Sequence, residues 1–190
     1  MTSALICVVM AWAAVWCVTV GLGAWLEPRP AADRDGGRAE SSAEDPGDRL
    51  FGLFWTGHVV LLALLQVVHL ARPIDGVVAL GVASVGLVAF VGALWSGRLG
   101  TSSTLLPPSK TGWVVSGLLT LWLANRALGP CTNYDSGLYH LPMMEWLQRW
   151  PIVPGLANLE PRFGFNNAGL LHATLLDVGL ISGWGPHLAS

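Results

Sequence analysis

The chain has 190 residues, of which 53% are hydrophobic and 12% are charged, whereas a typical soluble domain carries about 25% charged residues. The formal net charge is −2, and no cluster of Lys and Arg is interleaved with aromatic residues. Composition therefore argues against a soluble enzyme and excludes a nucleic acid as partner. Eleven charged residues lie within 27–49, and eleven are spread over the other 167 positions, a distribution typical of membrane spans joined by polar loops.

Five apolar runs are long enough, or nearly so, to cross a bilayer, whose hydrocarbon core of about 30 Å needs about 20 helical residues. Three of them, 4–26, 50–71 and 76–97, contain no charged residue. Two shorter runs, 113–129 and 168–184, hold a few polar groups and are predicted as a fourth and a fifth span. The first run lacks a basic amino-terminal region, so we interpret it as a retained helix rather than as a signal peptide.

The sequence therefore predicts an all-α, polytopic transmembrane bundle of about five spans. The polar segment after the first run mixes Pro, Gly and charges without apolar periodicity, so we expect it to be disordered. The chain ends directly after the fifth run, so we expect a truncated span and a fragment of a longer protein. The expected units are the first span (1–26), the disordered loop (27–49), three spans (50–129), an extracytoplasmic loop with a surface helix (130–167) and the fifth span (168–190).

The distribution of Lys and Arg predicts the orientation, because cytoplasmic loops are enriched in these residues. With the amino terminus outside, the inner loops hold six such residues and the outer loops hold four. This count places 130–167 on the extracytoplasmic side of a bacterial inner membrane. Membrane lipid is the expected partner of such a multi-pass protein.

Polar residues that could take part in catalysis or binding are concentrated in the loop after the fourth run. Asp135 and Tyr139 are four residues apart and His140 follows, so one helical turn would place the carboxylate beside the phenol with the imidazole nearby. Asp135 could then act as a general base or as the ligand of a divalent metal. Alternatively, Asp135 caps the helix that follows, because Asp is a preferred N-cap residue.

An amphipathic helix is predicted next in this loop. Pro142 suits a first-turn position, and apolar residues then recur with helical spacing at Met143, Trp146, Leu147 and Trp150. Such a helix either lies at the membrane surface or packs against the transmembrane bundle.

A second polar motif stands immediately before the fifth run. Asn166 or Asn167 is a natural N-cap for the helix that follows, and Arg162 precedes it. An anionic phosphate would there meet both a guanidinium group and free backbone N–H groups. Alternatively, Arg162 pairs with Glu160 or with a lipid phosphate.

Several polar residues fall inside the predicted spans. Asp177 is expected to face the bundle interior or a wet cavity, because a carboxylate in contact with lipid is costly. His172 is five positions away, about 140° round a helix, so we expect no relay between the two. Gln66 and His69 lie near the outer end of the second run, where they could reach under the polar loop.

A family resemblance rests on three motifs with fixed spacing within residues 133–176: DSGLYH from Asp135, VPGLANL from Val153 and RFGFN from Arg162. These motifs resemble a family of uncharacterised bacterial multi-spanning proteins that look like membrane glycosyltransferases of the GT-C class. The resemblance implies transfer of a sugar from a polyprenyl-phosphate donor to an extracytoplasmic glycan or lipid. It implies Asp135 as base or metal ligand, Arg162 as the group that meets the donor phosphate, and a site lined by Tyr139, His140, Glu160 and Asn166.

Two other functional classes fit the same composition. A polysaccharide transporter, flippase or polymerase component would use Asp177 and Arg126 along a substrate path, although the sequence has no internal repeat of the kind that many transporters show. A non-catalytic small membrane subunit is the third class, and it is favoured if the chain is complete.

Overall fold

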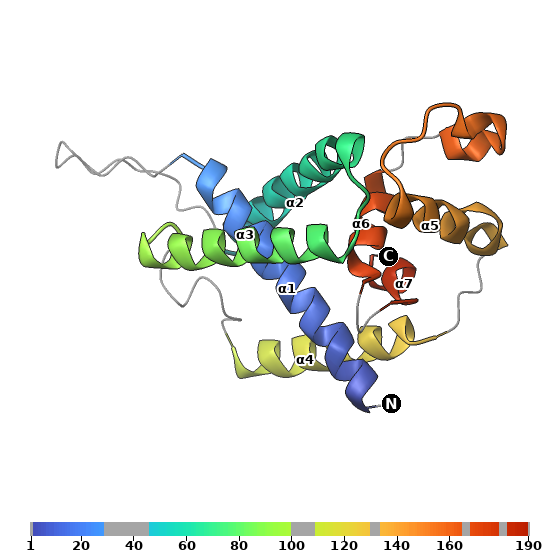
Figure 1. The fold of residues 1–190 in the computed structure, drawn as a ribbon. Helices are drawn as coiled ribbons and strands as arrows, with labels where there is room; N and C mark the ends of the chain where they lie inside the picture. Colours follow the sequence, from blue (N-terminus) through green and yellow to red (C-terminus); the bar gives the residue numbers. More distant parts are fainter. Residues whose placement is uncertain are drawn as a thin grey trace.

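The computed structural model describes residues 2–28, 46–99, 109–129, 134–164, 168–178 and 182–189. It is all-α, as the sequence predicts (Figure 1). The α-helices are α1 (Thr2–Leu26), α2 (Pro46–Ala71), α3 (Gly76–Trp95), α4 (Lys110–Ala127), α5 (Leu141–Arg149), α6 (Ala168–Leu176) and α7 (Gly185–Leu188). A π-helix, η2 (Ser136–His140), leads into α5, and two 3-10 turns, η3 (Leu156–Asn158) and η4 (Pro161–Gly164), follow it.

Three helices in the described part of the chain are long and apolar enough to cross a membrane: Ser3–Leu26, Gly47–Ala71 and Gly76–Trp95. They coincide with the three uncharged runs, so the prediction of membrane spans is confirmed for these runs. The predicted polar loop is shorter than expected at its end, because Asp48 lies in the first turn of α2. The expectation that this loop is disordered concerns 29–45, which lies outside the described residues.

The prediction of five spans is wrong. The fourth run forms α4, which starts at Lys110 and carries Arg126 in its last turn, and it is not among the three candidate spans. The fifth run forms only the nine residues of α6, about 14 Å at 1.5 Å per residue, or less than half of a bilayer core. The chain then turns, and α7 packs against α6 instead of extending it.

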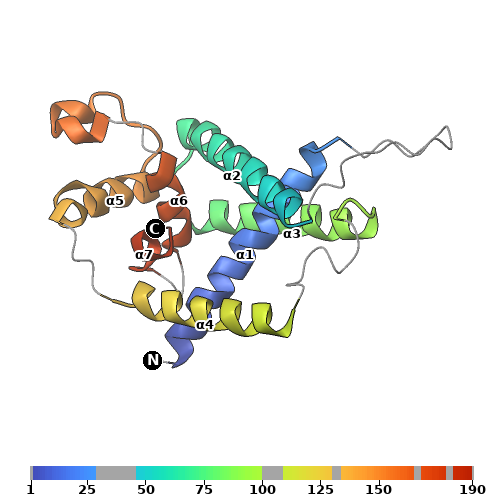
Figure 2. The same cartoon turned by 180° about the vertical axis from the view of Figure 1, so that it is seen from behind.

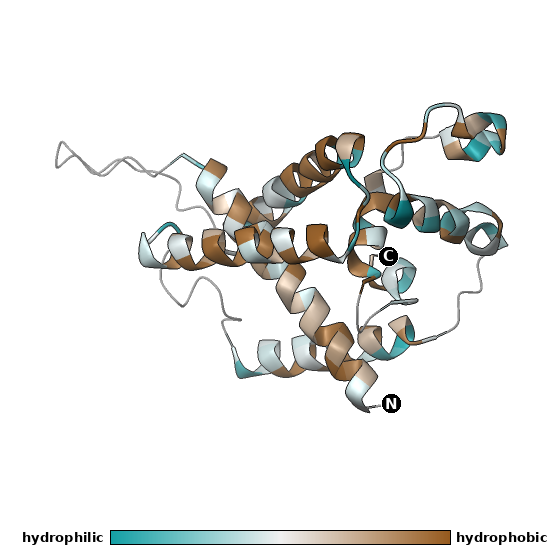
Figure 3. Cartoon of the chain, viewed as in Figure 1, coloured by the Kyte–Doolittle hydropathy of each residue, from teal (hydrophilic) through white to brown (hydrophobic). Residues whose placement is uncertain are grey.

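Helix α1 is the centre of the bundle. It passes between α3, which lies in front of it in Figure 1, and α2, which lies in front of it in Figure 2. Its buried side chains fall into three hydrophobic clusters, with Val18 facing α2, α3 and α6, Val20 and Ala24 in the cluster with Leu53, and Val8 beside α4 and α7. Many of the most hydrophobic residues of the chain lie along these three helices (Figure 3).

Glycines allow this close packing. A Cβ atom at Gly57 of α2 would overlap the carbonyl group of Thr19, and one at Gly21 of α1 would overlap the backbone of Phe90 in α3. Because lipid tails are as apolar as Leu, helices in a bilayer associate through close contact rather than through the hydrophobic effect, and small residues permit that contact. The pairs α1–α2 and α1–α3 are therefore specified by glycine positions.

Hydrogen bonds to the side chain of Asp75 stabilise the turn between α2 and α3. Asp75 is the N-cap of α3 and accepts hydrogen bonds from the backbone N–H groups of Val77 and Val78, while Arg72 donates to its other oxygen at 3.0 Å. The N–H of Val78, joined by the guanidinium of Arg72, holds the pKa of Asp75 below its usual value. The cap is thus charged at neutral pH, and its contribution to stability is lost as the pH falls through this lowered pKa.

The glycine contact predicts an asymmetric response to alanine substitution. Gly57→Ala should lower the thermal midpoint of the purified protein, because the added methyl group forces α1 and α2 apart at a cost of about 1–3 kcal/mol. Gly52→Ala is the matched control in the same helix, because a Cβ there meets only open space. Circular dichroism in detergent measures both midpoints, and equal values for the two variants would contradict the packing described here.

Candidate functional site

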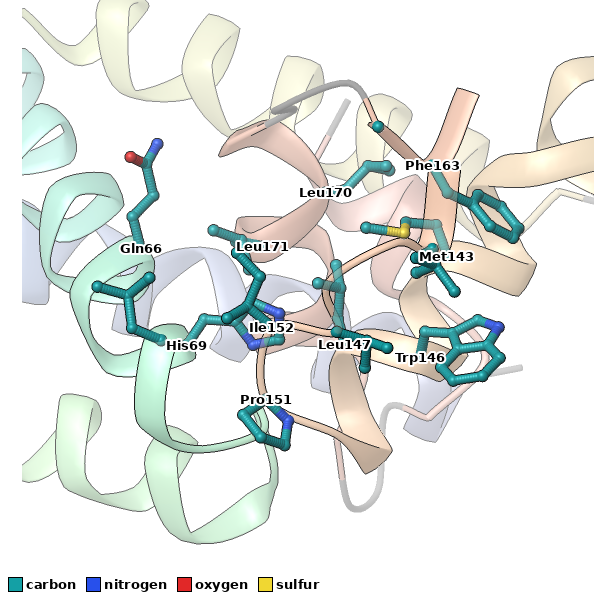
Figure 4. Close-up of a pocket in the computed structure, with 14 residues that line it drawn as sticks. Gln66, His69, Met143, Trp146, Leu147, Pro151, Ile152, Phe163, Leu170 and Leu171 are labelled. Carbon is teal, nitrogen blue, oxygen red and sulfur yellow. The ribbon is translucent and has the colours of Figure 1, made fainter. Parts of the chain in front are cut away.

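A cavity of about 330 Å³ opens beside the carboxyl end of α2, under the segment that follows α5. Figure 4 shows its wall, with Gln66 and His69 coming from α2, Met143 and Trp146 from α5, and Leu171 from α6. The other residues that line it are Leu70, Leu147, Pro151, Ile152, Val153, Leu156, Phe163, Gly164 and Leu170. The wall is therefore largely apolar, which suits a hydrophobic ligand.

Helix α5 forms one side of the cavity. It begins with a Pro in its first turn and buries Met144 and Leu147 against the bundle, so the interpretation that this helix packs against the bundle is the one the structure supports. Trp150, expected on the same apolar face, is 54% exposed. Its φ of −133° at the end of the helix takes it off the helical register.

Two backbone hydrogen bonds dock this region onto the turn between α2 and α3. The N–H of Ile74 donates to the carbonyl of Leu147 at 2.8 Å, and the N–H of Ile152 donates to the carbonyl of His69 at 2.9 Å. The second bond uses a carbonyl at the end of α2, where a helix leaves its last acceptors unpaired. The cavity wall is thus joined to the membrane-spanning helices by backbone contacts.

Asp177 joins α5 to the turn between α6 and α7 through hydrogen bonds. Its Oδ1 accepts hydrogen bonds from the backbone N–H groups of Gly183 and Gly185, and the side chain of Gln148 donates to its Oδ2 and to its carbonyl. The carboxylate therefore turns the chain from α6 into α7 and ties both to α5. Asp177 is predicted from the sequence to lie inside a membrane span. Because α6 ends before Asp177, this residue lies at a turn instead.

Polar side chains on and beside η2 and η4 form a cluster, here called the polar rim, next in the chain to residues of the cavity wall. The guanidinium of Arg162, on η4, lies 5.3 Å from the ring centroid of Tyr139, on η2, and the rings of Tyr139 and His140 are 4.3 Å apart. Glu160 reaches Arg162 at 3.9 Å. Four of the six predicted site residues are therefore brought together, and the pairing of Arg162 with Glu160, weighed as an alternative, is also present.

Asp135 stands at the start of η2, one turn before Tyr139. It is half-buried, has right-handed helical backbone angles, and makes no side-chain capping hydrogen bond to the helix. The alternative that Asp135 serves as an N-cap is therefore not supported. The π-helix itself, closed by a hydrogen bond from the N–H of Leu141 to the carbonyl of Ser136, is a conformation found often at functional sites.

The sixth predicted residue, Asn166, lies outside the described residues, as does Asn167. The structure therefore leaves the predicted phosphate site at the start of α6 without a described N-cap. Helix α6 itself begins at Ala168, close to where the sequence places the start of this helix.

The rim adjoins the cavity wall along the chain. Phe163 and Gly164, which line the cavity, directly follow Arg162, and Met143 lies on the helix that begins after His140. Arg162 remains 42% exposed, so its guanidinium is accessible to a ligand. The arrangement offers an apolar chamber and, next to it, a cation with phenol, imidazole and carboxylate groups.

Gln66 and His69 line the cavity, as the position of these two residues in the second run indicates. A contact between two histidines was missed in the sequence analysis. His172 of α6 faces His58 of α2, with ring centroids 4.8 Å apart. These two residues are 114 positions apart and on different helices, so no local pattern links them. The apolar lining from α6 was also missed, since the fifth run was expected to cross the membrane.

An all-α bundle with three candidate membrane-spanning helices, and a loop docked over a cavity at one end, defines a multi-pass membrane protein. The chain belongs to the family described as domain of unknown function DUF8201, whose profile matches residues 5–183. No curated protein matches the chain. No solved structure matches it either.

The role of Asp177 predicts a loss of stability on its removal. Asp177→Ala should cost about 1–3 kcal/mol, because two backbone N–H groups and the amide of Gln148 lose their acceptor. Glu145→Ala is the control, since this carboxylate is 60% exposed and pairs across the surface of α5 with Arg149, and it should change stability by less than about 0.5 kcal/mol. Thermal unfolding in detergent measures both, and a larger effect of Glu145→Ala would overturn this assignment.

Proposed function

We propose that this protein is a membrane glycosyltransferase of the GT-C type, which transfers a sugar from a polyprenyl-phosphate donor to an extracytoplasmic glycan or lipid acceptor. The observation that carries the proposal is that Arg162 of the polar rim directly precedes Phe163 and Gly164, which line the apolar cavity. A polyprenyl-phosphate sugar has the same two parts, a long hydrocarbon chain and an anionic head, in direct succession.

The two halves of the site meet the two parts of such a donor separately. The cavity lies between α2, α5 and α6 and buries hydrocarbon at about 0.8 kcal/mol for each CH₂ group. Arg162 presents a planar fork of N–H donors that matches phosphate oxygens. Its existing partner, Glu160, holds it at 3.9 Å, a loose exposed pair that a phosphate can replace at little cost.

Asp135 is proposed as the general base. Its carboxylate accepts the proton of the acceptor hydroxyl, the hydroxyl oxygen forms a bond to the anomeric carbon, and the bond from that carbon to the phosphate oxygen breaks. The electron pair leaves with the phosphate, whose negative charge Arg162 stabilises. Tyr139, His140, Glu160 and Asn166 are proposed to line the sugar-binding part of the site.

A divalent metal ion at Asp135 belongs to the same proposal as the alternative role of that carboxylate. Among the described residues, no group of three or more His, Cys, Asp or Glu gathers around a common point. A metal held by Asp135 would therefore draw further ligands from the phosphate oxygens of the donor or from water.

The proposed location is a bacterial inner membrane with the site on its outer face. The site lies at the end of the bundle formed by the carboxyl end of α2 and the start of α3. Residues 27–49, which run from the end of the first spanning helix into the start of the second, carry four Arg, whereas the α2–α3 turn carries Arg72, and this excess supports a cytoplasmic position for the opposite end.

Two substitutions test the proposed chemistry. Asp135→Asn should lower the rate of transfer from a polyprenyl-phosphate sugar by about a hundredfold or more, because the amide cannot accept the proton. Arg162→Gln should raise the KM for that donor by about tenfold or more, through loss of a charge-assisted hydrogen bond to phosphate. Transfer to an acceptor in membranes that contain the full-length protein measures both.

Arg149→Gln is the matched control, because Arg149 is 68% exposed, pairs with Glu145 one turn before it, and is not among the residues that line the cavity. It should leave transfer unchanged. Full activity of Asp135→Asn, in protein with the normal thermal midpoint, would remove the proposed catalytic role.

The cavity predicts a dependence on the length of the donor chain. Ile152→Trp should fill the space while keeping the backbone hydrogen bond to His69, so donors with long prenyl chains should lose more affinity than donors with one or two prenyl units. Leu159→Trp serves as control, because Leu159 is 74% exposed and lies outside the cavity wall. Equal losses for long and short donors would place the hydrocarbon chain elsewhere.

A further inference from the structure

A second cavity lies at the opposite end of the three spanning helices. It has a volume of about 160 Å³ and sits where α1 ends, α2 begins and α3 ends. Its lining contains three charged residues, Glu27, Arg49 and Arg98, together with Ala24, Pro28, Ser96 and Gly97. The polar loop site described above contributes nothing to it.

Two arginines and one carboxylate line this cavity. Arg49 pairs with Glu27 at 2.8 Å and donates to the carbonyl of Arg98 at 2.7 Å. Arg98 donates to the carbonyls of Ala24 and Glu27 at the end of α1. Among the described residues, one guanidinium is thus matched by a carboxylate, whereas the other is matched by the partial negative charge of a helix carboxyl end.

Arg98 retains an unused hydrogen-bond donor among the described residues. Its Nε atom is buried and, within the described part of the chain, has no hydrogen-bond partner. Its guanidinium lies 4.6 Å from the ring centroid of Trp25, whose indole is itself held by a hydrogen bond to the carbonyl of Ala89. A cationic group held against a fixed aromatic ring beside an open cavity is prepared for an anion.

We propose that this cavity binds the phosphate group of an anionic membrane phospholipid. The position of the cavity favours a phospholipid as the source of the phosphate. The cavity lies at the ends of three apolar helices, where lipid headgroups meet the protein. A soluble phosphate ion has the same chemistry but lacks the acyl chains that the apolar helix surfaces beside the cavity would contact. The proposal does not rest on the glycosyltransferase function.

The pairing of Arg49 with Glu27 supplies a sharp test. In the lipid proposal, Glu27 competes with the phosphate for Arg49, so Glu27→Gln should tighten binding of phosphatidylglycerol by about fivefold, as expected for one charge near an anionic headgroup. Arg49→Gln should weaken it by about the same factor. If the cluster only holds the helix ends together, both variants lower the thermal midpoint, and neither changes the affinity for phosphatidylglycerol.

Native mass spectrometry of the detergent-purified full chain measures the affinity, with phosphatidylglycerol, phosphatidylcholine and inorganic phosphate as the three probes. Phosphatidylglycerol should bind most tightly to the native chain, and Arg149→Gln, which removes a charge from the exposed surface of α5, should not change this order. Equal binding of phosphatidylcholine, or displacement of phosphatidylglycerol by inorganic phosphate at the same concentration, overturns the lipid assignment.

Ser96→Asp keeps the test decisive if the variants at Arg49 or Glu27 do not fold. Ser96 lines the cavity and is exposed, and its hydroxyl donates a 3.3 Å hydrogen bond to the carbonyl of Ala93. The added carboxylate should remove the preference for phosphatidylglycerol while the thermal midpoint stays near that of the native chain. An unchanged preference in this variant contradicts the proposal.

Discussion

The close contact of α1 with α2 and α3 is the constraint on which the rest of the structure depends. Backbone meets backbone where Gly57 lies against Thr19 and where Gly21 lies against Phe90, and such contact supplies the attraction that apolar surface alone cannot supply in a bilayer. Once α1 is held between its two neighbours, both ends of the three helices are set. One end becomes the Asp75 turn and the other becomes the cluster of Arg49, Glu27 and Arg98.

Each end of this bundle then carries a cavity with a different chemistry. At the Asp75 turn, the backbone bonds from Ile74 and Ile152 dock the polar loop, and the space beneath it is lined mostly by apolar side chains. At the other end, the cavity is small and its lining is charged. The two proposals draw on this division, with an amphipathic ligand proposed for one end and an anionic headgroup for the other.

The polar part of the candidate site could be read from the sequence because its members are close together in the chain. Tyr139, His140, Glu160 and Arg162 all stand in one loop between hydrophobic runs, and the structure brings them together. The cavity could not be read in the same way. Its wall joins α2, α5 and α6, and a residue such as Leu171 differs in no local respect from a residue that faces lipid.

The sequence by itself determined the helical class, the three uncharged spans and the position of the amphipathic helix, because length, charge and periodicity act within one segment. Only the tertiary structure decided that the last run stops after nine residues. The reason is that Asp177 accepts hydrogen bonds from Gly183, Gly185 and Gln148, partners that become available only when the chain has folded back. The pairing of His58 with His172 was decided at the same level, since helices distant in sequence meet only through packing.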